Sequence, residues 1–160
     1  MYVSITNGGA LEWAARGNVA ETFRVMSNEL STPKVLFCQQ DKAHSIATNF
    51  TDSFSERNIS YFIGLGVSLT NSTAFLSGDG NFLLNNLPAN RGVISLGSNA
   101  PLAWDAARHS FSEKRGWFRE TKISWGNIGL GDGSVQSWRS SELESRLQQT
   151  GLATNSFVLP

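Results

Sequence analysis

The chain of 160 residues predicts an α+β fold, in which a helix packs on an antiparallel sheet of four to six strands. Three observations support this prediction. An apolar stripe with helical spacing lies near the N-terminus, two alternating runs meet at an Asp-Gly pair within residues 125–138, and a capped helical pattern follows them. We expect one domain, 1–160, since a domain of about 150 residues buries roughly two-thirds of its unfolded surface.

The first helix is predicted to begin after Asn18. Together with Glu21, three positions later, Asn18 can form a capping box that satisfies two free backbone N–H groups. Three apolar side chains then recur at helical spacing: Phe23, Met26 and Leu30. This stripe should face the core, and the helix should end before Pro33.

Apolar stretches in the middle of the chain predict the strands of the sheet. They cover residues 34–38, 59–67, 74–76 and 92–96. The second of these is the richest in β-branched and aromatic residues, which favour a strand. The polar stretch 39–58 predicts a long loop. Residues 99–124 predict a second loop, which has a short helical turn near 104–108 and projects from the sheet.

The pair Asp132-Gly133 predicts a β-hairpin within residues 125–138. Both residues can adopt the positive φ of a type I′ turn, and such a turn would place Leu130 opposite Val135 on the core face. An Asp-Gly turn more often serves architecture than chemistry. We therefore interpret the pair as part of the scaffold.

A second helix is predicted to follow the hairpin. Ser141 and Glu144 have the spacing of a capping box, Leu143 and Leu147 share one face, and Gly151 marks the end of the helix. The apolar tail after Gly151 should dock as an extended segment. This helix is expected to cover an edge of the sheet.

Charge and cysteine content exclude several classes of function. Thirteen basic and thirteen acidic side chains cancel, so no broad field would attract nucleic acid or an anionic membrane. Cys38 is the single cysteine, which makes an internal disulfide impossible and predicts a buried, inert thiol. No window of 18 apolar residues occurs, and the first thirteen residues are too polar for a signal peptide.

No motif for catalysis, cofactor binding or metal binding is found, so the chain is predicted not to be an enzyme. His44 and His109 have no ligand partner at helical spacing, and a zinc site would need more ligands of suitable type. Asp79 and Asp132 each precede an oxygen-bearing side chain by two positions, as in the start of a calcium loop. Neither continues as an EF-hand. Calcium therefore stays an alternative to simple turn chemistry, and we expect no metal to be needed for folding.

Residues 126–136, Gly-Asn-Ile-Gly-Leu-Gly-Asp-Gly-Ser-Val-Gln, resemble the C-terminal signature of bacterial prepilin-type proteins. Those proteins carry a histidine, nine residues and then Asp-Gly, and are related to type II secretion pseudopilins. Further stretches resemble the same proteins: 23–34, 47–51, 59–64, 76–79 and 150–155. Lys122 stands at the position of the family histidine, for which His109 could substitute beyond an apparent insertion. The family's Cys-Pro-x-Asp pattern reads Cys38-Gln-Gln-Asp41 here.

The resemblance implies a pilin-like or pseudopilin-like head domain that follows an anchor helix not present in this sequence. Its function would be that of a structural subunit of a type II secretion pseudopilus or a type IV pilus-like assembly, on the periplasmic or cell-surface side of the cytoplasmic membrane. Its partners would be other pilin-like or secretion-system subunits, and the isolated domain would be a monomer. The alternative is a binding module that holds a carbohydrate or a protein through the tryptophan-rich region 104–125.

Overall fold

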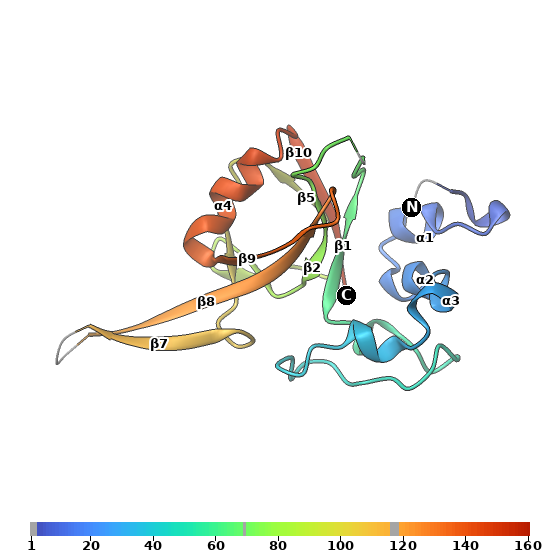
Figure 1. Cartoon of the computed structure of the whole chain (residues 1–160), viewed down its shortest axis with the longest axis horizontal. Coiled ribbons are helices and arrows are strands. Elements are labelled where there is room, and N and C mark those ends of the chain that lie inside the picture. Colours follow the sequence, from blue (N-terminus) through green and yellow to red (C-terminus); the bar gives the residue numbers. More distant parts are fainter. Residues whose placement is uncertain (1–2, 69, 116–118) are drawn as a thin grey trace.

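The structure is a computed structural model that describes residues 3–68, 70–115 and 119–160. Seven strands form an antiparallel sheet in the order β5, β10, β1, β2, β8, β7, with β9 paired to β8, and the sheet curls into a half-barrel (Figure 1). Its strands are β1 (Tyr61–Leu65), β2 (Phe75–Asp79), β5 (Gly92–Gly97), β7 (Ser110–Arg115), β8 (Arg119–Leu130), β9 (Val135–Arg139) and β10 (Thr154–Leu159). A small sheet contains β3 (Phe82–Leu84), β4 (Leu87–Pro88) and β6 (Leu102–Trp104).

Helices are short in the described part of the chain. The α-helices are α1 (Leu11–Ala15), α2 (Val19–Arg24), α3 (Ser27–Leu30) and α4 (Ser140–Gln149). Three 3₁₀ turns cover Ile5–Asn7, Pro33–Leu36 and Glu56–Asn58. The predicted α+β fold, with one helix packed on a sheet as in a pilin head, is therefore wrong: the molecule is a curled β-structure.

The predicted N-terminal helix is broken into pieces. Asn18 does cap α2, since its side-chain oxygen accepts from the backbone N–H of Glu21 at 2.8 Å. The helix ends at Arg24, however, and a separate turn of helix, α3, follows from Ser27. Ser27 and Asn28 are weak helix formers, so the apolar stripe alone does not hold one continuous helix.

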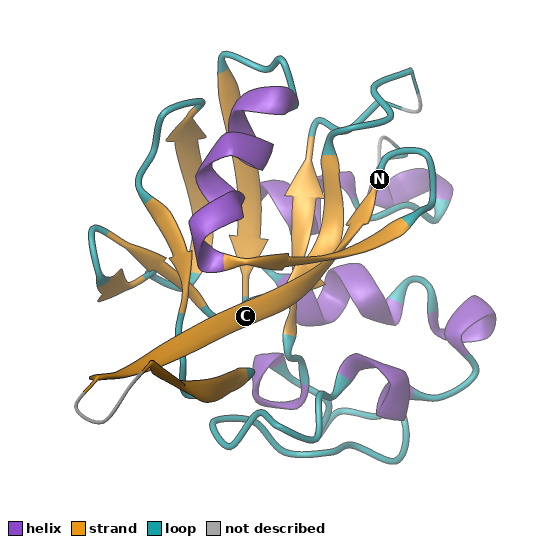
Figure 2. Ribbon diagram, turned by 60° about the vertical axis from the view of Figure 1, so that its left-hand side comes forward, coloured by secondary structure: helices purple, strands orange, loops and turns teal. Residues whose placement is uncertain are grey.

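The sheet is buried on both faces at its centre. Along β1, Phe62 packs into one apolar cluster with α4, whereas its neighbour Ile63 packs into a second cluster with α2. In β10, Phe157 packs into the cluster with α4 and its neighbour Val158 packs into the cluster with α2. Figure 2 shows α4 on one side of the sheet and the N-terminal helices on the other. The alternation of side chains along a strand thus explains why residues 59–67 are almost continuously apolar.

The β8–β9 hairpin forms with a register different from the predicted one. Its loop closes through bonds from Leu130 N–H to Ser134 O at 2.8 Å and from Gly133 N–H to Leu130 O at 2.9 Å. Gly133 has φ +84°, whereas Asp132 is not among the residues with positive φ, so the turn is not type I′. Gly129 faces Val135, and Val135 is 69% exposed rather than buried. A three-residue loop with a left-handed glycine moves the register by one position.

The C-terminal elements confirm part of the prediction. Leu143 and Leu147 are fully buried on one face of α4, and Gly151 follows the helix with φ +68°. The predicted Ser141–Glu144 capping box is wrong: Glu142 accepts from the backbone N–H of Arg139 at 3.0 Å instead. The tail is extended as predicted, but as β10 it lies inside the sheet between β5 and β1.

Two further regions differ from the prediction. Residues 34–38 do not form a buried strand, because the 3₁₀ turn Pro33–Leu36 leaves Val35 exposed. The region expected to project as a loop does project, but as a β-hairpin of β7 and the outer part of β8 (Figure 1). We call this hairpin the arm. Trp117 of the tryptophan-rich region lies outside the described residues.

Candidate functional site

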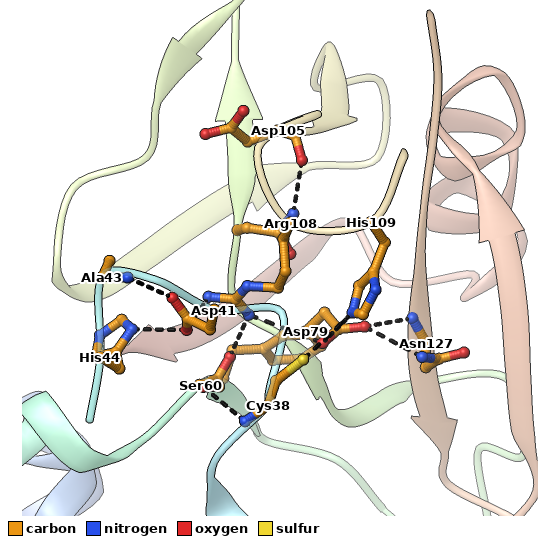
Figure 3. Close-up of polar contacts among 12 residues, drawn as sticks. Cys38, Asp41, Ala43, His44, Ser60, Asp79, Asp105, Arg108, His109 and Asn127 are labelled. Atoms are coloured by element: carbon orange, nitrogen blue, oxygen red, sulfur yellow. Dashed lines mark hydrogen bonds and ion pairs between the residues drawn. The ribbon is translucent and has the colours of Figure 1, made fainter. Parts of the chain in front are cut away.

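A partly buried polar cluster lies where the loop after the turn Pro33–Leu36 meets the start of β1, β2, β8 and the connection between β6 and β7 (Figure 3). Its members come from distant parts of the sequence and are linked by hydrogen bonds and ion pairs. They are Cys38, Asp41, His44, Ser60, Asp79, Arg108, His109 and Asn127. We call this set the polar cluster.

Asp41 is the acceptor at one end of the polar cluster. Its Oδ2 accepts from Nη2 of Arg108 and lies 2.7 Å from Nδ1 of His44, while Oδ1 accepts from the backbone N–H of Ala43 at 3.0 Å. Burial raises the pKa of Asp41. Hydrogen bonds from His44 and Ser60 and the charge of Arg108 outweigh this effect and lower the pKa to about 2. Asp41 is therefore ionised at neutral pH, and both of its carboxylate oxygens have hydrogen-bond partners.

Asp79 is the acceptor at the other end, and its side chain is 1% exposed. Its Oδ2 accepts from the backbone N–H of Asn127 at 2.7 Å and from the side-chain amide of Asn127 at 3.3 Å. Its Oδ1 lies 3.7 Å from Nη1 of Arg108 and 3.6 Å from Nε2 of His109. Both distances exceed a normal hydrogen bond, so Oδ1 can still accept a closer partner.

Cys38 and His109 lie beside Asp79. The Sγ atom of Cys38 is 3.5 Å from Nε2 of His109, and the backbone N–H of Cys38 donates to Oγ of Ser60 at 3.0 Å. The ring of His109 lies near that of Trp125, with centroids 5.8 Å apart. One ligand atom from each of Cys38, Asp79 and His109 lies within 4.8 Å of the other two.

Local structure explains why the chain delivers these side chains together. The backbone N–H of Asp41 donates to the Cys38 carbonyl at 2.9 Å, so the Cys-x-x-Asp spacing places both residues on one tight turn. Arg108 and His109 are adjacent and come just before β7, where the His109 carbonyl accepts from the N–H of Trp125 at 3.1 Å.

Charge also affects the phenol next to the cluster. Tyr61 begins β1 and pairs with Asp79 across the sheet. Burial raises the pKa of Tyr61, and the negative charge of Asp79 raises it further. The Tyr61 hydroxyl therefore stays protonated and can act only as a neutral donor or acceptor here.

The geometry does not match a Cys-His-Asp catalytic relay. In such a relay the nucleophile and the carboxylate contact opposite nitrogens of the histidine. Here the Sγ atom of Cys38 and Oδ1 of Asp79 both lie near the same nitrogen, Nε2 of His109. The prediction that the chain is not an enzyme stays a prediction.

A cleft of about 450 Å³ adjoins the polar cluster beside Asp41, His44 and Arg108. Two polar atoms of its lining residues, Nε2 of His44 and Oδ1 of Asn81, are buried and have no hydrogen-bond partner among the described residues. The lining of the cleft is nevertheless mostly apolar, with Phe82, Pro88 and Ala89 beside these two polar atoms.

The structure separates the residues that the sequence singled out. His44, Asp79 and His109 belong to the polar cluster, whereas Asp132 lies in an exposed turn, where its carboxylate accepts from the N–H of Ser134 at 2.9 Å. Lys122 lies on the arm opposite Ser112. His109 therefore belongs to the polar cluster. Lys122, which stands where the prepilin-type motif has its histidine, does not.

Sequence reasoning missed that Cys38, Asp79 and His109 meet. The one signal that could have found this is the resemblance itself, because its stretches supply cluster members. The Cys-x-x-Asp motif contributes Cys38 and Asp41, residues 59–64 contain Ser60, residues 76–79 end at Asp79, and residues 126–136 contain Asn127.

Comparisons of the chain with protein-family models, curated proteins and solved structures give no match. The resemblance to prepilin-type proteins accordingly rests on the motifs quoted above. In the described part of the chain, no helix has both the length and the apolar character needed to cross a membrane.

Proposed function

We propose that the chain is a non-catalytic head domain of a subunit in a type II secretion pseudopilus or type IV pilus-like assembly, located on the periplasmic or cell-surface side of the membrane. One observation carries the proposal. Three of the six stretches that resemble prepilin-type proteins, together with the Cys-x-x-Asp motif, contribute residues to the single polar cluster. Motifs that serve structure rather than chemistry are expected to meet in this way, because their residues hold distant segments of the chain together.

The arm supplies a surface suited to contacts between subunits. It extends away from the core in Figure 1, β7 ends the strand order of the sheet, and Phe111 on β7 is 45% exposed. A strand at the end of a sheet can pair with a strand of another chain. We infer that the arm contacts neighbouring subunits of the assembly.

The test is to express the tagged protein in the cells that encode it, and to shear and pellet the surface filaments. The proposal predicts that the chain is found in the pelleted filaments, and that Phe111→Ser lowers this amount. The matched control is Val135→Ser, the same kind of change at an exposed site on β9. Absence of the wild-type chain from filaments and from every secretion-system complex would contradict the proposal.

A carbohydrate- or protein-binding module is the second candidate, and one observation favours it. A cleft of about 280 Å³ is lined by Phe111, Trp125 and Trp138, together with Arg139 and Glu142. Aromatic rings beside polar groups suit sugars. Trp104, in contrast, is buried in the core and cannot contact a ligand. Binding of the isolated domain on a glycan array, lost in Phe111→Ala, would favour this candidate.

A further inference from the structure

We propose that Cys38, Asp79 and His109 bind a divalent transition metal of the zinc type in tetrahedral geometry. This inference goes beyond the proposed function, because a head domain could assemble with or without such a site. The three side chains offer sulfur, oxygen and nitrogen, the three ligand types that proteins use for zinc. They extend from three separate elements toward one another (Figure 3).

The distances between the ligand atoms fit one central ion. With zinc bonds of about 2.0 to 2.3 Å, tetrahedral ligand atoms lie about 3.4 to 3.6 Å apart. The Sγ atom of Cys38 is 3.5 Å from Nε2 of His109, and Nε2 is 3.6 Å from Oδ1 of Asp79. The third separation is within 4.8 Å, so a small shift of one side chain would complete the geometry.

The shared nitrogen distinguishes a metal site from a proton relay. Nε2 of His109 faces both Sγ of Cys38 and Oδ1 of Asp79, so all three lone pairs can be directed at one point. A thiol–imidazole pair that only exchanges a proton has no need for a carboxylate at the same nitrogen. A metal ion does need this convergence.

A divalent ion would also balance the charge of the polar cluster. A zinc-bound Cys38 is a thiolate, and Asp79 and Asp41 are carboxylates, which gives three negative charges. Arg108 forms ion pairs with both carboxylates and supplies one positive charge. The divalent ion would supply the remaining two, so the buried group would be neutral.

Neighbouring residues hold the ligands in place. Asn127 binds the second oxygen of Asp79, Ser60 binds the backbone of Cys38, and Trp125 lies against the ring of His109. Such outer contacts orient metal ligands and increase metal affinity. The described residues offer three ligands, which leaves the fourth position of a tetrahedron to water.

The experiment is a titration of the 160-residue chain with Co²⁺, followed by displacement with Zn²⁺. We expect one equivalent of Co²⁺ to produce the visible bands of tetrahedral cobalt and a thiolate-to-cobalt charge-transfer band, and Zn²⁺ to remove both. Cys38→Ser should lose the charge-transfer band. His109→Gln and Asp79→Asn should weaken binding at least about tenfold. The control is Asp132→Asn, which changes an exposed carboxylate outside the polar cluster and should bind as the wild type does.

Protection of the thiol tests the site in the unmodified chain, in case a variant fails to fold. Zn²⁺ at one equivalent should slow alkylation of Cys38 by N-ethylmaleimide at least about tenfold, and Mg²⁺ should not. Absence of cobalt bands together with unchanged alkylation would overturn the proposal. Rapid alkylation unaffected by Zn²⁺ would show that Cys38 is an accessible free thiol rather than a metal ligand, and would also overturn the proposal.

Discussion

Arg108 and Asp41 are 67 positions apart in the sequence, yet their side chains form an ion pair within the polar cluster. The side chains are 7% and 3% exposed. Arg108 also donates to the Ser60 carbonyl at 2.7 Å, so one guanidinium joins the loop after the turn Pro33–Leu36, the residue before β1 and the connection before β7. Residues 33–41 therefore contact the sheet through this ion pair as well as through the apolar packing of Leu36.

Asp41→Asn should destabilise the domain and change its response to acid. The pKa of Asp41 in the folded chain is about 2, below its ordinary value of 3.8. Ionised Asp41 therefore adds stability above about pH 4, and this is lost as the pH falls toward 2. The variant should lose about 3 kcal/mol at pH 7, since Arg108 loses its buried partner, and should show a shallower acid dependence. Urea unfolding between pH 7 and pH 2 measures both effects.

The control is Asp52→Asn, which removes the same charge from an exposed loop position. It should change the free energy of unfolding at pH 7 by less than about 0.5 kcal/mol. Equal losses in the two variants would show that net charge, rather than the Asp41–Arg108 contact, sets the stability.

Gly133→Val should destabilise the domain through the β8–β9 turn. Gly133 has φ +84°, a conformation in which a Cβ costs about 1 kcal/mol and a β-branched side chain costs more. Asp132→Asn should be nearly silent, because an amide oxygen can also accept from the N–H of Ser134. Thermal unfolding compares the variants, with Gly97→Val on β5 as the control, since that glycine has open space and no positive φ. If Asp132→Asn lost assembly while its stability was unchanged, Asp132 would have a functional role and the scaffold interpretation would be wrong.

Gly126→Ala should destabilise the core more than most alanine substitutions do. A Cβ at Gly126 would lie 2.7 Å from the ring of Trp104. That ring cannot easily move, because it stacks on Phe82 and donates from Nε1 to the Trp138 carbonyl at 2.9 Å. We expect a loss of about 1 to 3 kcal/mol in urea unfolding. Gly129→Ala on the same strand is the control, and equal stability of the two variants would contradict this packing.

The isolated domain should sediment as a monomer. The proposed assembly needs partner subunits as well as the arm, and the charge of the chain is balanced. Sedimentation velocity at high micromolar concentration checks this. A stable dimer that Phe111→Ser dissociates would show that the arm is sufficient for self-association.

Features set by neighbouring residues could be predicted from the sequence. The cap at Asn18, the buried face of Leu143 and Leu147, and the end of α4 before Gly151 each depend on residues within a few positions. The strand at β1 was recognisable because both of its faces are buried. The hairpin was recognisable too, but its register depends on whether one or two turn residues adopt positive φ.

Long-range pairing could not be predicted in this way. The tail becomes β10 because Val158 pairs with Ile63 on one side and with Val93 on the other, and nothing near Val158 in the sequence encodes those partners. The same limit applies to the site. Cys38 and His109 are 71 positions apart, so no local spacing marks them as neighbours.

The polar cluster holds residues 33–41 on the sheet. Hydrogen exchange followed by mass spectrometry on the wild type and on Arg108→Gln tests it most directly. In the variant, amides of residues 33–41 should exchange faster, because the contacts of Arg108 with Asp41 and Ser60 are lost. Amides of α4 should keep their protection. Unchanged exchange in residues 33–41, or an equal loss in α4, would contradict the claim.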